Sequence, residues 1–445
     1  MDEEIILANV SSMTAEQLFT AIKAGNVTLD KLIQTGDLGP GKRSKIKASL
    51  EELGLEDDVA WEKVRYTNNE MTISGYITSF PSGKYVTDAK EKIQYLEHER
   101  RKLQEAKQGI LDNIKNNSNK YRPDEIEEYL KNGTLTHDEL VERGIPESII
   151  HAVLNPKRLS LKIGETPTSI PDGYTEVYFW GMPGSGKTCA LGALLSTADK
   201  AGYLNIASGT GYAYGYGVKN IFLNENTYLP MPTPVEKTQY VPFTLKKANE
   251  KNSRSVSLIE LSGEMFKCFF KKNAGLEFNS PHLEAGFNST MEFLKGNNRK
   301  IHFFFVDYNN DGRVDDDGFT QANYLNAASN FFNDAENNIF GKSTDAVYVV
   351  LTKSDLMNCS SEDRVSKAKE YVSNPPFSSF VNTLKSNLRK NSINSGRLTV
   401  EPFSLGDVYF QQICSFDDRT SHNILEILFD RIKPSKKSIL DVFNK

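Results

Sequence analysis

The α/β part of this chain is marked by one short stretch, Trp180-Gly181-Met182-Pro183-Gly184-Ser185-Gly186-Lys187-Thr188. It follows a strand-like run at 175–179 and precedes a helix-like run at 189–195. Glycines let successive backbone N–H groups turn inward without Cβ clashes, and the N-terminus of the following helix adds partial positive charge. In such a loop Lys187 reaches the outer phosphates and the Thr188 hydroxyl holds Mg²⁺. The pattern predicts a nucleoside triphosphate site made of Gly181, Gly184, Ser185, Gly186, Lys187 and Thr188; a glycine-rich turn without a ligand is the alternative.

A second motif indicates which base is bound. The apolar, β-branched run 345–351 predicts a buried parallel strand, and Thr352-Lys353-Ser354-Asp355 follows it directly. The Asp355 carboxylate can accept hydrogen bonds from N1–H and the N2 amino group of guanine, a donor pair that adenine lacks. The stem of Lys353 can lie across the base. Alone, the motif is also common in ordinary loops; after a buried strand and downstream of a phosphate loop, it predicts guanine binding through Thr352, Lys353 and Asp355.

A third motif lies between these two. The strand-like run 255–259 leads into Glu260-Leu261-Ser262-Gly263-Glu264. The order GMPGSGKT, ELSGE and TKSD resembles the translation-factor and Ras-like (TRAFAC) class of P-loop GTPases, and residues 172–435 fit that class. The resemblance implies a Ras-like α/β domain with a mostly parallel sheet and flanking helices. It also implies GTP or GDP, Mg²⁺ and two switch loops that sense the γ-phosphate.

The resemblance gives the residues of the third motif their roles. Glu260 takes the position of the family's Asp, which supports Mg²⁺, and the Gly263 N–H is expected at the γ-phosphate. Glu264 stands where many members carry a water-positioning Gln. Its negative charge near an anionic phosphate predicts hydrolysis that is slow without a partner. An ordinary strand and turn is the alternative interpretation.

The first switch of the family supplies a threonine that closes over Mg²⁺. Thr233 and Thr238 are candidates, and the setting Leu229-Pro230-Met231-Pro232-Thr233 favours Thr233. The preceding segment 202–228 is rich in Gly, Tyr and Asn, and it is interpreted as a long loop that is functional, disordered or built with short strands. This insert and the LPMPT element resemble GTPase domains of bacterial conflict and defence systems.

Ser404 follows the strand-like run 397–403 and resembles the start of the loop that approaches guanine O6 in this class. A plain strand end is the alternative. The run 424–432 is amphipathic and predicts a C-terminal helix that packs on the sheet.

One acidic segment lies outside the GTPase pattern. Residues 307–315 match the first nine positions of an EF-hand-type calcium loop, which follows a strand-like run at 300–306. Position 12 is Gly318 where a bidentate Glu is needed, so an acidic surface loop is the stronger interpretation. The candidate Ca²⁺ ligands are Asp307, Asn309, Asp311 and Asp315.

Composition limits the classes of partner. The 445 residues carry a net charge of −5, and neither residues 1–170, at −5, nor the remainder, at zero, is basic. This argues against nucleic acid and against anionic membrane surfaces as partners. We find no signal-peptide core and no 18-residue apolar run, and the four cysteines are scattered. We therefore expect a soluble, cytoplasmic protein with no membrane span.

The N-terminal part is helical, acidic and internally similar. Residues 14–50 align with 123–154 at an offset of 108, and each copy reads as a helix ended by Gly, followed by a Thr-capped helix. The copies resemble small helical adaptor repeats, although chance similarity of two capped hairpins is the alternative. Five positions are identical in the two copies at this offset: Gly25 and Gly133, Thr28 and Thr136, Asp30 and Asp138, Leu32 and Leu140, and Gly36 and Gly144.

The expected organisation is an all-α helical repeat region followed by the α/β domain. Residues 57–118 between the copies resemble a TPR-like hairpin and contain a long helix at 88–114. The expected parts are adaptor repeat A (1–56), the TPR-like hairpin with its long helix (57–118), adaptor repeat B (119–156), a linker (157–171) and the GTPase domain (172–437).

These features predict a guanine-nucleotide switch that hydrolyses GTP slowly with Mg²⁺. Lys187, Glu264 and Thr233 are its expected catalytic residues. Nucleotide state would be coupled to protein partners through the N-terminal helices and the switch loops. A nucleotide-binding scaffold with little or no turnover is the alternative. An ATP-dependent oligomerising NTPase is disfavoured by the TKSD motif.

Overall fold

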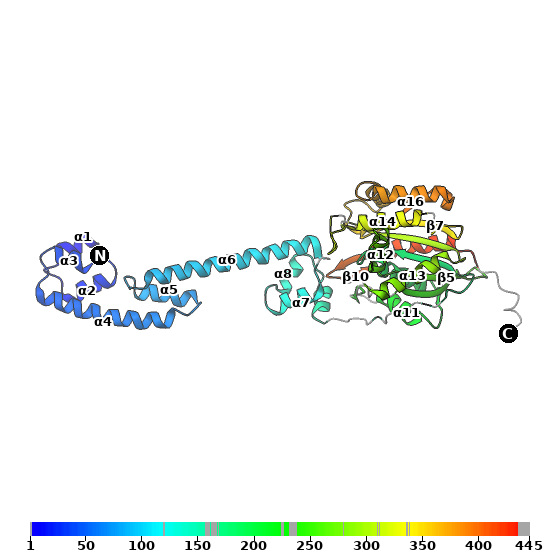
Figure 1. Ribbon diagram of the computed structural model, residues 1–445. Helices are drawn as coiled ribbons and strands as arrows, with labels where there is room; N and C mark the ends of the chain where they lie inside the picture. Colours follow the sequence, from blue (N-terminus) through cyan, green and yellow to red (C-terminus); the bar gives the residue numbers. More distant parts are fainter. Residues whose placement is uncertain are drawn as a thin grey trace. The chain divides into compact units, whose positions relative to one another are not determined.

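The computed structural model describes residues 2–118, 121–155, 161, 167, 169–223, 227–230, 238–278, 280–308, 310, 312–334, 337 and 339–434. The chain forms two compact units, Met1–Asp112 and Asn113–Lys445. The described part of the first unit is helical, whereas the second contains an α/β domain (Figure 1). None of the helices in these ranges is both long and apolar enough to cross a membrane.

The first unit buries two small apolar clusters between its helices. Leu18, Leu32 and Ile46 belong to one cluster, and Ile73 and Tyr76 belong to the other. The long helix expected at 88–114 is part of one continuous helix. The helices are α1 (Glu3–Ala8), α2 (Ala15–Lys23), α3 (Leu29–Gln34), α4 (Pro40–Val64), α5 (Glu70–Ser79) and α6 (Val86–Asn117), of which α6 continues into the second unit.

The two segments that align in sequence also have the same local structure. Gly25 and Gly133 end their helices with left-handed φ values of +74° and +75°. Three residues later, the side chains of Thr28 and Thr136 accept hydrogen bonds from backbone N–H groups of the next helix. The second segment contains α7 (Pro123–Lys131), α8 (His137–Glu142) and α9 (Glu147–Leu154).

A seven-stranded sheet forms the centre of the α/β domain. Its spatial order is β2 (Leu204–Ile206), β4 (Gln239–Leu245), β5 (Arg254–Glu260), β1 (Thr175–Trp180), β6 (Lys300–Asp307), β7 (Thr344–Thr352) and β8 (Thr399–Pro402). Neighbours from β5 to β8 are parallel, whereas β4 is antiparallel to both β5 and β2. Every residue of β1 and β6 is buried, which explains their nearly continuous apolar sequences. The predicted fold class is therefore confirmed.

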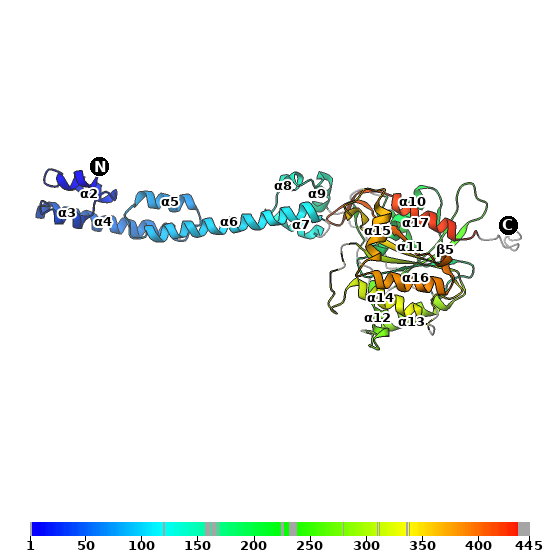
Figure 2. The same ribbon diagram turned by 90° about the horizontal axis from the view of Figure 1, so that it is seen from above.

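Helices cover both faces of this sheet (Figure 2). Successive strand residues point to opposite faces, so Phe179 packs with the first layer and Trp180 with the second. The first layer contains α10 (Lys187–Lys200), α11 (Tyr212–Ile221) and α17 (Arg419–Arg431). The second contains α12 (Gly263–Asn273), α13 (Pro281–Lys295), α14 (Gln321–Asn333), α15 (Arg364–Ser373) and α16 (Ser378–Lys390).

The helix α11 occupies much of the insert for which the sequence predicted a long loop. Short strands, one of the three expected possibilities, flank it, but the helix itself was missed. Gly is a poor helix former, which hides the helix in a Gly- and Tyr-rich sequence. The helix is stabilised instead by close packing on β4. Gly215 allows this approach, because a Cβ at that position would lie 2.7 Å from Val241 Cγ1. After α11, β3 (Thr227–Tyr228) joins β10 (Gln412–Phe416) and β9 (Gly406–Tyr409) in a second sheet that the sequence also did not predict.

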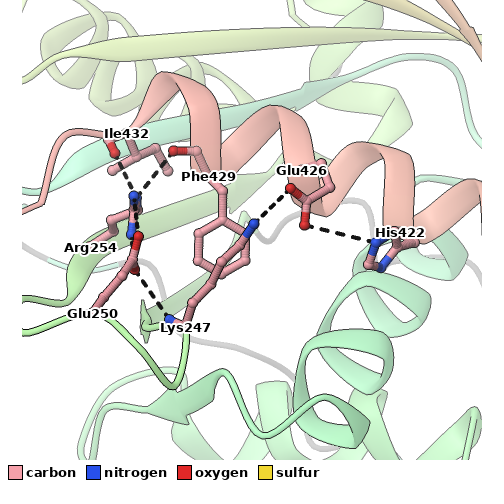
Figure 3. Close-up of polar contacts among 7 residues, drawn as sticks. All are labelled: Lys247, Glu250, Arg254, His422, Glu426, Phe429 and Ile432. Carbon is pink, nitrogen blue, oxygen red and sulfur yellow. Dashed lines mark hydrogen bonds and ion pairs between the residues drawn. The ribbon is translucent and has the colours of Figure 1, made fainter.

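Arg254, the first residue of β5, fixes the end of α17 (Figure 3). Its Nε donates hydrogen bonds to the carbonyl oxygens of Phe429, at 3.2 Å, and Ile432, at 2.9 Å. Carbonyl groups at a helix C-terminus lack partners within the helix, so this contact satisfies two of them. Glu250 accepts a hydrogen bond from the same guanidinium at 2.9 Å. The predicted C-terminal helix is thus packed on the sheet and anchored to it.

Candidate nucleotide-binding site

The three sequence motifs meet at one edge of the sheet. The phosphate loop follows β1, Glu260 ends β5, and Thr352 ends β7. These strands are parallel, so their carboxyl ends lie at the same edge, where open α/β sheets bind their ligands. The end of β6 lies there too, and it carries Asp307.

The loop between β1 and α10 has the backbone conformation that its glycines predict. Gly184 and Gly186 have φ values of +74° and +86°. A Cβ on Gly181 would lie 2.7 Å from Ser185 Oγ and 3.0 Å from the Phe305 carbonyl oxygen, so no side chain fits there. Gly186 precedes the first turn of α10 and provides no side-chain cap. An uncapped helix N-terminus of this kind favours an anion.

Lys187 is buried at the base of this loop. Its ammonium group donates hydrogen bonds to the carbonyl oxygens of Gly181, at 2.8 Å, and Met182, at 2.9 Å. Burial lowers the pKa of Lys187 to about 8, and the nearby Glu260 carboxylate opposes this shift. The ammonium is thus held next to the uncapped helix end, where it can meet phosphate oxygens.

The candidate magnesium site contains only oxygen donors. Glu260 is fully buried. Its carboxylate accepts one hydrogen bond from the Thr188 hydroxyl and another from Tyr214, with an O···O distance of 2.9 Å. Magnesium prefers such oxygen ligands and commonly keeps several waters and substrate phosphates around one or two protein groups. Thr188 and Glu260 therefore fit Mg²⁺. No group of three or more His, Cys, Asp and Glu residues that could hold a metal occurs in the described part of the chain.

The third motif, residues 260–264, touches the phosphate loop. Gly263 starts α12, and a Cβ on it would lie only 2.0 Å from the backbone nitrogen of Pro183. Only glycine allows this approach. Glu264 forms an ion pair with Lys267, at 3.3 Å, and Lys267 also pairs with Asp315 at 2.6 Å. The carboxylate expected to orient water thus has a partner on its own helix.

The two threonine candidates of the first switch differ in their placement. Thr233, which the sequence favoured, lies outside the described residues. Thr238 is buried and directly precedes β4. Its neighbour Gln239 pairs with Glu260 in the sheet register. This places Thr238 at the edge that carries the candidate magnesium site.

The base motif is joined to the phosphate loop. The buried Thr352 hydroxyl donates to the Ser185 carbonyl, at 3.0 Å, and also lies 3.2 Å from the Val306 carbonyl. Lys353 adopts a left-handed conformation with φ of +54°. Its ammonium group lies 2.8 Å from Asp307 Oδ2. Asp355 follows in a short 3₁₀ turn, and its side chain is exposed at this edge.

Ser404 lies beside the base motif, but its backbone is engaged within the protein. Its N–H donates to Thr420 Oγ1 at 3.1 Å, and the Thr420 hydroxyl donates back to the Ser404 carbonyl at 2.7 Å. The preceding carbonyl, of Phe403, accepts a hydrogen bond from Ser354 N–H at 3.1 Å. The loop is therefore next to the TKSD turn, with the N–H group of Ser404 directed to α17.

The acidic segment at 307–315 has lysine partners at two of its candidate calcium ligands. Asp307 binds Lys353, and Asp315 binds Lys267. Burial raises the pKa of Asp307, and Lys353 opposes that shift. Asn309 and Asp311 lie outside the described residues. For Asp307 the structure thus indicates a role in supporting the base motif, which no sequence motif suggested.

Tyr214 is the other site residue that the sequence analysis missed. It comes from α11, and no motif marks it within a run in which Tyr alternates with Gly or Ala. A helix predicted over residues 212–221 would have placed Tyr214 on the face opposite Tyr212 and Tyr216. This helical spacing is the only feature of the sequence that could have indicated a buried Tyr214.

Fold and site together define a P-loop domain of the Ras-like GTPase fold. No protein-family model and no curated protein matches the sequence. One similar solved structure is described as nucleolar GTP-binding protein 1 from Plasmodium falciparum, with 11% identity over 59% of this chain and 90% of that chain, and a TM-score of 0.26. Another is the Ski7 GTPase-like domain of S. cerevisiae bound to GTP, with 14% identity over 61% of this chain and 55% of that chain, and a TM-score of 0.30. Superpositions this loose do not bear on function, so the assignment of the fold rests on the strand order and the phosphate loop.

Proposed function

We propose that this protein is a guanine-nucleotide switch that binds GTP or GDP together with Mg²⁺. The observation that carries the proposal is the link between the base motif and the phosphate loop through Thr352 and Ser185. This link sets Asp355 and Lys187 at one edge of the sheet, as one nucleotide would need. Lys187 and the N-terminus of α10 would bind the phosphates, and Thr188 and Glu260 would hold the cation, which neutralises phosphate charge.

Nucleotide preference tests this proposal directly. Nucleotide released from the purified protein should be GTP or GDP, and titration with labelled GTP and ATP in the presence of Mg²⁺ should show selective binding of GTP. Equal binding of the two nucleotides, or selective binding of ATP, would show that Asp355 does not select guanine and would favour an ATPase.

Slow hydrolysis is the second part of the proposal. Glu264 can orient a water, but its charge lies near the position of an anionic phosphate and its carboxylate is paired with Lys267. Multiple-turnover phosphate release should therefore be slow, and it should rise in Glu264→Gln, which keeps a group that can orient water but removes the charge. No turnover in either protein would favour the second candidate function, a nucleotide-binding scaffold.

Protein partners of the N-terminal helices form the third part. A groove of about 690 Å³ between α4 and α5 supports it, because exposed Leu55 and Val59 line the groove together with Tyr76. Apolar grooves of this kind accept helices or peptides of partner proteins. A photocrosslinking residue at position 55 should form adducts with partner proteins, and the yield of these adducts should differ between the protein loaded with GTPγS and the protein loaded with GDP. The same probe at exposed Leu103 on α6 is the control, and yields independent of nucleotide would contradict the coupling.

The cellular setting is proposed on sequence resemblance alone. The insert and the LPMPT element suggest a role in bacterial conflict or defence. Neither residues 1–170, at a net charge of −5, nor the remainder, at zero, is basic, which suggests protein rather than nucleic-acid partners in the cytoplasm. Loss of the chain's gene should then alter phage or toxin sensitivity, and unchanged sensitivity would argue against this setting.

A further inference from the structure

Tyr214 connects the insert helix α11 to the candidate magnesium site. Its side chain is 4% exposed, and its hydroxyl donates to Glu260 Oε2 at 2.9 Å. The other carboxylate oxygen of Glu260 accepts from the Thr188 hydroxyl. One carboxylate thus binds both the last residue of the phosphate loop and a helix that lies outside the three motifs.

The identity of residue 260 explains why such a contact matters. Glu has one more rotatable bond than the Asp that the GTPase pattern has here, so its carboxylate needs more restraint to stay in place. Two hydroxyl donors, one on each oxygen, provide that restraint.

The helix that carries Tyr214 is packed so closely that it can transmit a change at Glu260. A Cβ on Gly211 would lie 2.1 Å from the Tyr240 carbonyl oxygen, and one on Gly215 would clash with Val241. The helix therefore lies directly on β4. Its opposite face exposes Tyr212 and Tyr216, whose ring centroids are 6.0 Å apart.

We infer that Tyr214 is a positioning residue for the magnesium site, and that it makes the conformation of α11 depend on bound nucleotide. The inference rests on the guanine-nucleotide function proposed above. Tyr214 holds Glu260 in the orientation that supports the cation. In return, any shift of Glu260 on cation binding is passed to α11 through the same hydrogen bond.

The test measures the Mg²⁺ dependence of fluorescent GTP binding in the full-length protein and in Tyr214→Phe. Loss of one hydrogen bond to a buried carboxylate should raise the Mg²⁺ concentration for half-maximal binding about tenfold. Saturating Mg²⁺ should restore the affinity of Tyr214→Phe for GTP. A folding defect would lower the affinity at every Mg²⁺ concentration. Tyr212→Phe, which removes an exposed hydroxyl from the same helix, should behave as the wild type.

A double-mutant cycle separates restraint of Glu260 from a general effect of Tyr214. The shorter carboxylate of Glu260→Asp moves away from Tyr214, so adding Tyr214→Phe should change the Mg²⁺ midpoint by less than about threefold. An equal, tenfold change in both backgrounds would overturn the role assigned to Tyr214.

Hydrogen–deuterium exchange tests the second half of the inference. Residues 212–221 should change their exchange rate when GTP and Mg²⁺ are added to the wild type, and this change should be reduced in Tyr214→Phe at saturating Mg²⁺. If the wild type binds GTP but the change in the exchange rate of α11 is the same in the wild type and in Tyr214→Phe, the coupling is refuted. If the wild type does not bind GTP at all, the proposed function itself fails.

Discussion

The ammonium group of Lys353 lies 2.8 Å from the carboxylate of Asp307, so the base motif after β7 is tied to the end of β6. Asp307 is 4% exposed, whereas the Lys353 side chain is 48% exposed. The ion pair therefore fixes the end of a long side chain at a buried carboxylate and leaves the stem of Lys353 beside the expected position of the base. Asp307, one of the candidate ligands of the calcium loop, thus helps to order the turn that carries the proposed base-binding residues.

This pairing predicts the behaviour of the acidic segment towards calcium. Two of its candidate ligands, Asp307 and Asp315, already neutralise lysines. We expect calorimetric titration with micromolar to millimolar Ca²⁺ to show no binding heat. A measurable heat that disappears in Asp307→Asn would restore the calcium interpretation.

Asp355 should determine the choice of base. An amide in its place can no longer accept both hydrogen bonds from guanine, but it can donate one to the C2 oxygen of xanthine. Asp355→Asn should thus lower GTP affinity by at least about 100-fold and favour xanthosine triphosphate. Competition binding with both nucleotides measures the change. Replacement of the neighbouring exposed Leu356 by Ala is the control, and GTP selectivity that survives Asp355→Asn removes this residue from the site.

Lys187 should make GTP binding depend on pH. Burial lowers its pKa to about 8, and bound phosphate would raise it again. Above pH 8 binding must therefore take up a proton, and GTP affinity should fall by up to about tenfold per pH unit, whereas below pH 8 this effect is absent. Titrations at pH 7, 8 and 9 in buffers of different ionisation heat measure both the affinity and the proton uptake.

Substitutions of Lys187 provide the controls for that experiment. Lys187→Arg keeps its charge over this range and should lose the pH dependence even if it binds more weakly. Lys187→Ala should abolish nucleotide binding. An alanine variant with normal affinity would disprove the phosphate-loop assignment.

Gly263 should tolerate no side chain. The Cβ of Gly263→Ala would lie 2.0 Å from the Pro183 nitrogen, so the phosphate loop or the start of α12 must move. We expect a loss of about 1–3 kcal/mol in unfolding free energy together with weaker GTP binding. Urea unfolding and nucleotide titration measure the two effects. Gly54→Ala, in open space within α4, should leave GTP binding unchanged; a Gly263→Ala protein that behaves in the same way would contradict the close approach.

Arg254 should contribute strongly to the stability of the α/β domain. Arg254→Ala removes hydrogen bonds to two carbonyl groups at the end of α17 and leaves Glu250 without its cation, which should cost about 2–4 kcal/mol. Thermal unfolding of the domain measures the loss. Lys247→Ala removes the partly exposed pair with Glu426 and the contact of its ammonium group with the Phe429 ring, and should cost about 1 kcal/mol. Equal effects of the two substitutions would show that the carbonyl contacts are unimportant.

Elements whose cause is local could be predicted from the order of the amino acids. Apolar runs predicted β1 and β7, and the glycines and Lys187 predicted the phosphate loop. Thr28 and Thr136 marked the starts of helices. These patterns depend on backbone geometry and on short-range hydrogen bonds. Features that depend on residues far apart in the chain became visible in the folded domain. The helix α11 forms in a glycine-rich segment because it packs on β4 and α10. Tyr214 reaches Glu260 across 46 positions of sequence, and Lys353 reaches Asp307 across the same number. The folding of the sheet brings these pairs together, and no spacing rule along the chain contains that information.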